Sequence, residues 1–204
     1  MDDAAATPCA TTMTRTWEGG ISVECRRQPL AAAASMKVGA NSLLGAALTY
    51  AASGLAVVPL YSAGGNRCDC ARGTGCGSPG KHPRTEHGLS DATTDPRRIA
   101  MWWSRWSSAG VGVAVPPLFA VIDVDDYEAF EELERIGIAL PETLVAATPR
   151  GWHYWYRTRR PVRPRVGVLP HLDLRGPGSY VVVFPTPGYR WLTVPHAIPY
   201  VELR

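Results

Sequence analysis

The chain has 204 residues, of which 46% are hydrophobic, 20 are glycine and 18 are proline. This length can bury the core of one domain, and the glycines and prolines indicate short elements with many breaks. The net charge of +3 excludes a uniformly basic surface, so recognition of a polyanion would depend on local patches.

The sequence has no pattern of a membrane or secreted protein. It contains no run of roughly eighteen apolar residues, the length that a spanning helix needs. Asp2 and Asp3 stand where a signal peptide carries positive charge. We therefore expect a cytoplasmic protein with no membrane partner, in which cysteines serve metal binding before disulfides.

Residues 1–38 differ in composition from the rest of the chain. They contain alanine runs and scattered threonines without sustained periodicity, which is typical of a disordered tail. The alternative is that Met36 is the natural start. Residues 39–204 are expected to form the folded domain, with residues 62–90 as a long inserted loop.

The rest of the chain alternates helical and strand patterns. Asn41 or Ser42 can cap a first helix, and Thr94 or Asp95 a second one with a stripe of tryptophans that is typical of a core-facing surface. The mixed order, without internal repeats, predicts an α/β or α+β sandwich with helices packed on an antiparallel-rich sheet. The other apolar runs predict a strand at 55–60, a hairpin at 111–115 and 118–124, a helix over 126–136, a strand pair at 144–148 and 152–157, and strands at 172–174 and 180–184.

Two acids end the most informative apolar run, residues 119–125 (FAVIDVD). On a strand, Asp123 and Asp125 share one face about 6–7 Å apart, where they repel unless cations or water screen them. Two divalent ions would bridge them, and oxygen ligands prefer Mg²⁺ or Mn²⁺. The alternative is a solvated strand end in which Asp125 or Asp126 caps the next helix.

A third acid, Asp173, lies between apolar residues on a predicted strand. A buried carboxylate needs a partner. If this strand lies beside the first one, Asp173 completes a site of carboxylates. Arg175 shares its face and offers a second explanation, a plain ion pair, and both can hold at once.

A histidine and an arginine flank a glycine in residues 148–153 (TPRGWH). Gly151 would let the backbone approach a phosphate closely. Arg150 and His153 can both donate to phosphate oxygens. The alternative is a strand histidine that faces solvent.

Residues 62–90 contain a set of metal-binding side chains, namely Cys68, Cys70, Cys76 and His82. Three thiolates and one imidazole within fifteen residues match a closed tetrahedral zinc site, which would be structural because no open position remains. His87 is the alternative to His82 as a ligand, and the alternative to zinc is a reduced, metal-free loop.

Taken in order, these motifs resemble the bifunctional primase-polymerase (prim-pol) domain of the archaeo-eukaryotic primase superfamily. The resemblance runs from about residue 43 to the C-terminus. The matching segments are 50–59 (YAASGLAVVP), 80–83 (GKHP), 92–95 (ATTD) leading into 102–103 (WW), 121–125 (VIDVD), 148–153 (TPRGWH), 172–176 (LDLRG), 180–183 (YVVV) and 189–191 (YRW).

The resemblance implies a nucleotidyltransferase that makes or extends DNA or RNA strands on a DNA template from nucleoside triphosphates. Asp123, Asp125 and Asp173 would hold two Mg²⁺ or Mn²⁺ ions in a two-metal mechanism. His153 would contact the triphosphate of the incoming nucleotide, and Arg175 is a further nucleotide-binding candidate.

The resemblance also implies a two-lobed α+β fold. An RRM-like catalytic sheet would pack against a small N-terminal α/β unit, with the zinc loop as an insert. The chain departs from the family at Arg150, where a small residue is usual, at 176–179, which are less glycine-rich, and at 184–186 (FPT), which replace PPS. These departures concern substrate detail.

Basic side chains supply the candidate nucleic-acid contacts. Lys81 lies in the cysteine-rich loop, and five arginines follow the histidine strand. A run of this kind is commonly a solvated turn, but beside a nucleotide-contacting strand it would hold a template or primer. The arginines are Arg157, Arg159, Arg160, Arg163 and Arg165.

Two other functions fit parts of the pattern. One is a catalytically inactive, zinc-stabilised nucleic-acid-binding protein, which the intact acids and His153 disfavour. The other is a metal-dependent nuclease, which the nucleotide-contacting motif disfavours. The sequence has no Walker A lysine motif, so strand separation would come from a separate helicase or be unnecessary.

Overall fold

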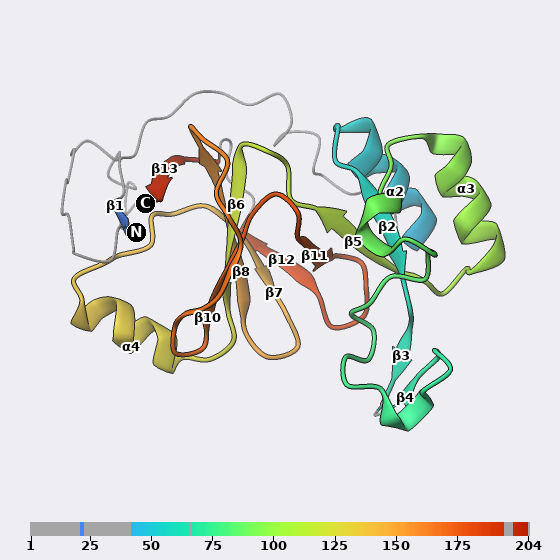
Figure 1. The fold of residues 1–204 in the computed structure, drawn as a ribbon, viewed down its shortest axis with the longest axis horizontal. Coiled ribbons are helices and arrows are strands. Elements are labelled where there is room, and N and C mark those ends of the chain that lie inside the picture. The colour runs from blue at the N-terminus through green and yellow to red at the C-terminus, as the bar shows by residue number, and fades with distance from the viewer. Residues whose placement is uncertain (1–20, 23–41, 66, 194–197, 204) are drawn as a thin grey trace, which may run out of the picture.

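The computed structural model describes residues 21–22, 42–65, 67–193 and 198–203 (Figure 1). Most of the predicted disordered tail, and Met36 with it, lies outside the described residues. The part that is described, β1 (Ile21–Ser22), pairs antiparallel with β13 (Tyr200–Leu203).

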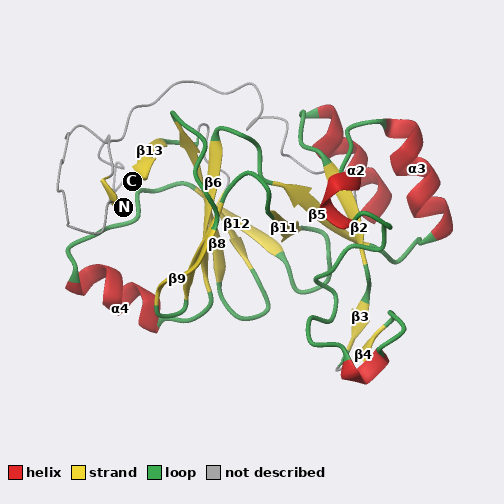
Figure 2. Cartoon of the chain, viewed as in Figure 1, coloured by secondary structure: helices red, strands yellow, loops and turns green. Residues whose placement is uncertain are grey.

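A three-stranded antiparallel sheet and two helices lie together at one end of the molecule (Figures 1 and 2). Ser42 accepts a hydrogen bond from the amide of Gly45, and Asp95 accepts one from Arg97, so both predicted helix caps are confirmed. The elements are α2 (Leu43–Ala52), β2 (Val57–Leu60), α3 (Pro96–Arg105), β5 (Gly110–Ala114) and β11 (Tyr180–Val183), with the strand order β11-β5-β2.

An eight-stranded sheet forms the larger of the two units, and α4 (Glu128–Arg135) covers one of its faces (Figure 2). Its central strand β8 pairs with β6 and β7 antiparallel and with β13 in parallel, while β10 pairs with β6 on the far side. The remaining strands are β6 (Phe119–Val124), β7 (Leu144–Ala147), β8 (Trp152–Thr158), β9 (Arg165–Leu169), β10 (Leu172–Arg175) and β12 (Arg190–Thr193).

The predicted hairpin between residues 111–115 and 118–124 is wrong. β5 lies between β2 and β11 in the smaller sheet, and β6 lies between β8 and β10 in the larger one. Pro116 and Pro117 explain the separation, because a tight two-residue hairpin turn needs positive φ angles, which proline cannot adopt. The connection therefore carries the chain from one sheet to the other.

The two faces of β6 belong to different cores, which fixes where each side chain of the strand points. Val121 packs with Trp155 into a core shared with α2, α3 and the smaller sheet. Ile122 and Val124 pack under α4 with Tyr156. Asp123, between these two, therefore lies on the face that the smaller sheet adjoins.

The loop of residues 62–90 has more structure than its composition indicates. It contains a short hairpin and two 3-10 helices, and it extends beyond the smaller sheet (Figure 1). Its elements are β3 (Ala63–Gly64), β4 (Arg67–Cys68), η1 (Gly73–Gly75) and η2 (Gly88–Asp91).

The prediction of mixed helix and strand is confirmed, since the described residues form a mixed α/β structure with a large sheet and few helices. Among the described residues, no helix is both long enough and apolar enough to cross a membrane.

Candidate active site and metal centre

Three of the predicted site residues lie side by side on neighbouring strands. Asp123 on β6 is the register partner of His153 on β8 and also of Asp173 on β10. Direct partners on antiparallel strands point to the same face of the sheet. The strand of Asp173 therefore lies beside the strand of Asp123, as a shared site of carboxylates requires.

Arg175 compensates the charge of these acids. Its guanidinium donates to Oδ2 of Asp123 at 3.0 Å and to Oδ2 of Asp173 at 2.7 Å. The predicted ion pair between Arg175 and Asp173 is thus confirmed. Asp173 also accepts a hydrogen bond from the amide of Gly167, at 2.7 Å, through its other oxygen.

His153 lies on the other side of Asp123, with its Nε2 3.4 Å from Oδ1 of that carboxylate. Burial alone would raise the pKa of Asp123, but His153 and Arg175 lower it below its usual range. The carboxylate is therefore stabilised as an anion. The Nδ1 atom of His153 is buried and has no hydrogen-bond partner among the described residues.

Asp125 follows the end of β6 and is held by its backbone. Its amide donates to the carbonyl of His171 at 2.8 Å, and His171 adopts a left-handed conformation with φ 58°. The Asp125 side chain is 40% exposed and lies 3.8 Å from the guanidinium of Arg150. The alternative prediction, that Asp125 or Asp126 caps the next helix, is wrong: the N-cap of α4 is Tyr127, without a side-chain cap hydrogen bond.

The three carboxylates fit a hard divalent cation by donor type. Their oxygens do not meet at one point, because Arg175 stands between Asp123 and Asp173. Among the described residues, the one group of ligand atoms gathered within 4.8 Å is the cysteine-histidine set. A cation between Asp123 and Asp173 therefore requires the Arg175 guanidinium to turn away.

Asp123 and Asp125 line a cavity of about 460 Å³ between the two sheets. Asp123, Asp125, His153 and Arg175 line it from the larger sheet. Tyr189 lines it too, with its ring 6.0 Å from that of His153, and burial together with the charge of Asp123 raises its pKa to about 12. No role for Tyr189 was predicted from the sequence, although it lies in the YRW segment. The smaller sheet and the cysteine-rich loop supply the other wall through Ser78, Lys81, His82, Leu89 and residues 178–182.

Gly151 is required for a different contact from the one predicted. A Cβ atom at this position would lie 1.8 Å from the carbonyl oxygen of Val124 and 3.0 Å from Cα of Asp125. The residue thus lets the β7–β8 turn pack against the backbone that carries Asp125. Close approach is confirmed, but it is to the protein's own chain.

The five arginines predicted to hold a template or primer lie in different environments. Arg157, on β8, places its guanidinium 4.4 Å from the ring centre of Tyr200, so it packs within the fold. Arg159 and Arg160 are exposed beyond the far end of β8, about 20 Å along the strand from His153. Arg163 and Arg165 are exposed as well.

The cysteine-rich loop gathers Cys68, Cys70, Cys76 and His82. Nε2 of His82 is 3.4 Å from the sulfur of Cys68 and 3.4 Å from that of Cys76, close to the edge of about 3.6 Å in a tetrahedral zinc site. His87 instead pairs with Asp91. Burial raises the pKa of the Cys68 thiol, but hydrogen bonds from the amides of Gly80 and Cys70 and from His82 outweigh it and lower the pKa to about 6.

Fold and site together define an α/β protein with an acidic cavity between two sheets and a separate thiolate-imidazole cluster. The sequence profile of one known family, described as bifunctional DNA primase/polymerase, N-terminal (Prim-Pol), matches residues 47–201. The chain belongs to this family. Membership indicates nucleotidyl transfer, a reaction for which enzymes of the family use divalent metals. A search of the curated proteins finds no match.

Replacing Gly151 tests the packing that positions Asp125. In Gly151→Ala the added methyl collides with the Val124 carbonyl, and overpacking of this kind costs about 1–3 kcal/mol. Thermal unfolding should show a lower midpoint than wild type. Gly64→Ala is the matched control, because no atom lies within 4 Å of the added carbon. Equal midpoints for the two variants would contradict the steric account.

Elemental analysis tests the metal centre. Purified, reduced protein should contain one zinc per chain, since the donor set and spacing fit that ion. Cys76→Ser and His82→Ala should lose it, while His87→Ala should retain it. Protein without stoichiometric zinc, or a Cys76→Ser variant that keeps its zinc, would refute this ligand set.

Proposed function

We propose that the protein is a DNA primase or polymerase that joins nucleotides on a template. The observation that carries the proposal is the register of β8, β6 and β10, which puts His153, Asp123 and Asp173 in one row on the same face of the sheet. His153 and Asp123 of this row line the cavity. Family membership supports the same reaction.

The proposed roles follow from the chemistry of each side chain. Asp123, Asp125 and Asp173 hold the divalent cations, Mg²⁺ or Mn²⁺. When bound, two such ions promote attack by a 3′-hydroxyl and stabilise the leaving pyrophosphate. Arg175 is displaced from the acids, so that its charge becomes available to phosphate oxygens.

His153 is placed to contact the triphosphate. Its ring is nearly buried, its Nε2 faces Asp123, and its Nδ1 has no partner among the described residues. A buried polar atom of this kind gains from a ligand that pairs with it. Arg150, mostly exposed and 3.8 Å from Asp125, adds positive charge that neutralises developing phosphate charge.

The remaining parts take supporting roles. The larger sheet is the RRM-like catalytic unit, packed against the small α/β unit, with a structural zinc in the loop. Arg159, Arg160, Arg163 and Arg165 contact the template backbone away from the acids, with the salt dependence that phosphate contacts produce. Strand separation, where needed, is left to another protein such as a helicase.

Primer extension with Mn²⁺, a labelled primer, a DNA template and nucleoside triphosphates tests this function. Asp123→Asn keeps the size of the side chain but removes its charge, so extension should fall by roughly 100-fold or more. Asp126→Asn is the matched control, because it makes the same change of charge at an exposed carboxylate that does not line the cavity.

Circular dichroism of both variants should show the wild-type fold. Near-normal extension by Asp123→Asn would refute the assignment of the acids. Shortening of the labelled strand without triphosphates, in place of extension, would indicate a nuclease.

A further inference from the structure

A second cavity, of about 440 Å³, adjoins the acidic one. The two share Ser78, Lys81 and Tyr189 as lining residues. One wall of the second cavity is the cysteine-rich loop, and the other includes the β7–β8 turn at Pro149 and Arg150. A ligand that begins at the acids can therefore continue past Lys81 into this space.

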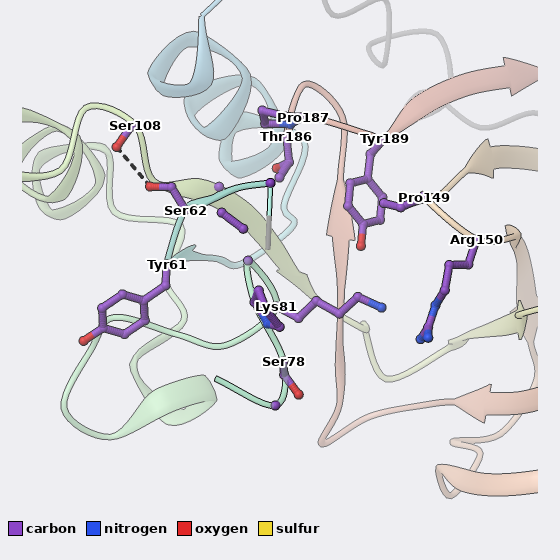
Figure 3. Close-up of a pocket in the computed structure, with 16 residues that line it drawn as sticks. Tyr61, Ser62, Ser78, Lys81, Ser108, Pro149, Arg150, Thr186, Pro187 and Tyr189 are labelled. Atoms are coloured by element: carbon purple, nitrogen blue, oxygen red, sulfur yellow. Dashed lines mark hydrogen bonds between the residues drawn. The ribbon is translucent and has the colours of Figure 1, made fainter. Parts of the chain in front are cut away.

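The second cavity suits an anion. Lys81 and Arg150 line it together with hydroxyl groups such as that of Ser78, and none of its described lining residues carries a carboxylate. Figure 3 shows the Lys81 side chain extending from the loop toward Arg150, with the Tyr189 hydroxyl pointing into the same gap. Two cations on opposite walls can hold a chain of phosphates between them.

The backbone of Lys81 is fixed firmly. Its carbonyl accepts a hydrogen bond from the hydroxyl of Tyr180 at 2.6 Å, and its amide donates to the carbonyl of Ser78 at 3.2 Å. The next residue, His82, accepts from the amide of Tyr61 at 2.9 Å. Within the described part of the chain, the Lys81 ammonium makes no ion pair, so its charge is available to a ligand.

The cysteine-histidine cluster clamps the cavity wall at both ends. Cys76 and His82 are members of the cluster, and the segment between them, residues 77–81, lines the second cavity throughout. A metal bound to these two side chains fixes the ends of a five-residue loop and limits where Lys81 can lie.

We propose that the second cavity binds the polyphosphate of a nucleoside triphosphate between Lys81 and Arg150, and that the metal-bound cluster positions Lys81 for this contact. The proposal rests on the proposed nucleotidyl transfer, and it replaces the nucleic-acid contact that the sequence pattern predicted for Lys81. Lys81 binds the nucleotide and not the template backbone, and the zinc site supports nucleotide affinity.

The test measures nucleotide and DNA binding separately, with full-length protein in Mg²⁺ that is zinc-loaded in wild type and in every variant that keeps the cysteine-histidine set. Calorimetry measures a nucleoside triphosphate and inorganic tripolyphosphate, and fluorescence anisotropy measures a single-stranded oligonucleotide. Lys81→Gln and Arg150→Gln should each weaken both phosphate ligands by about 10- to 100-fold, the usual range for a lost charged hydrogen bond. Oligonucleotide affinity should change less than about twofold.

Arg72→Gln is the matched control, because Arg72 is an exposed cation of the same loop that lines neither cavity. It should bind the triphosphate as wild type does. Cys76→Ser should reproduce the nucleotide defect of Lys81→Gln. The double variant should be no weaker than the worse single one, since both changes remove the same contact.

Each failure has its own meaning. If wild type extends primers but Lys81→Gln keeps its triphosphate affinity, or loses oligonucleotide affinity instead, this inference is overturned while the proposed function stands. An equal loss in Arg72→Gln would also overturn it, because the effect would then be one of general charge. Wild-type protein that binds neither triphosphate nor tripolyphosphate would overturn both.

Discussion

The antiparallel pairing of β6 with β8 and β10 is the constraint on which the rest of the site depends. It puts two carboxylates, Asp123 and Asp173, directly opposite each other on one half-buried face. Such a face is stable only when positive charge compensates it. Arg175 and His153 provide that compensation in the structure, and the lowered pKa of Asp123 is its consequence.

The surrounding structure keeps this face in register and open to a cavity. Gly151 allows the β7–β8 turn to contact the end of β6, and the carbonyl of His171 holds the amide of Asp125. The smaller sheet and the cysteine-rich loop close the other side with uncharged, hydroxyl-bearing and basic groups. Acidic and basic walls thus meet along one continuous space, as a phosphate-transfer substrate requires.

Local patterns predicted the parts of the fold that are fixed locally. Both capped helices and the β7–β8 pair follow from residues close in sequence. Which sheet a strand joins depends on residues far apart in sequence, so the predicted pairing of β5 with β6 is wrong. The short exposed strands β9 and β12 show no recognisable alternation of apolar and polar residues. The acids, His153 and the cysteine cluster could be singled out as candidates from the sequence because their chemistry is unusual. Tyr189 was not, since an aromatic residue on a strand commonly marks core packing.

The central claim is that the acidic face holds divalent cations in place of Arg175. Thermal unfolding of wild type and Asp123→Asn, with and without Mn²⁺, tests it most directly, because a ligand that binds the folded state raises the midpoint by mass action. The account predicts that Mn²⁺ raises the midpoint of the zinc-loaded wild type and leaves that of Asp123→Asn unchanged. An equal rise in both proteins, or none in wild type, would contradict it.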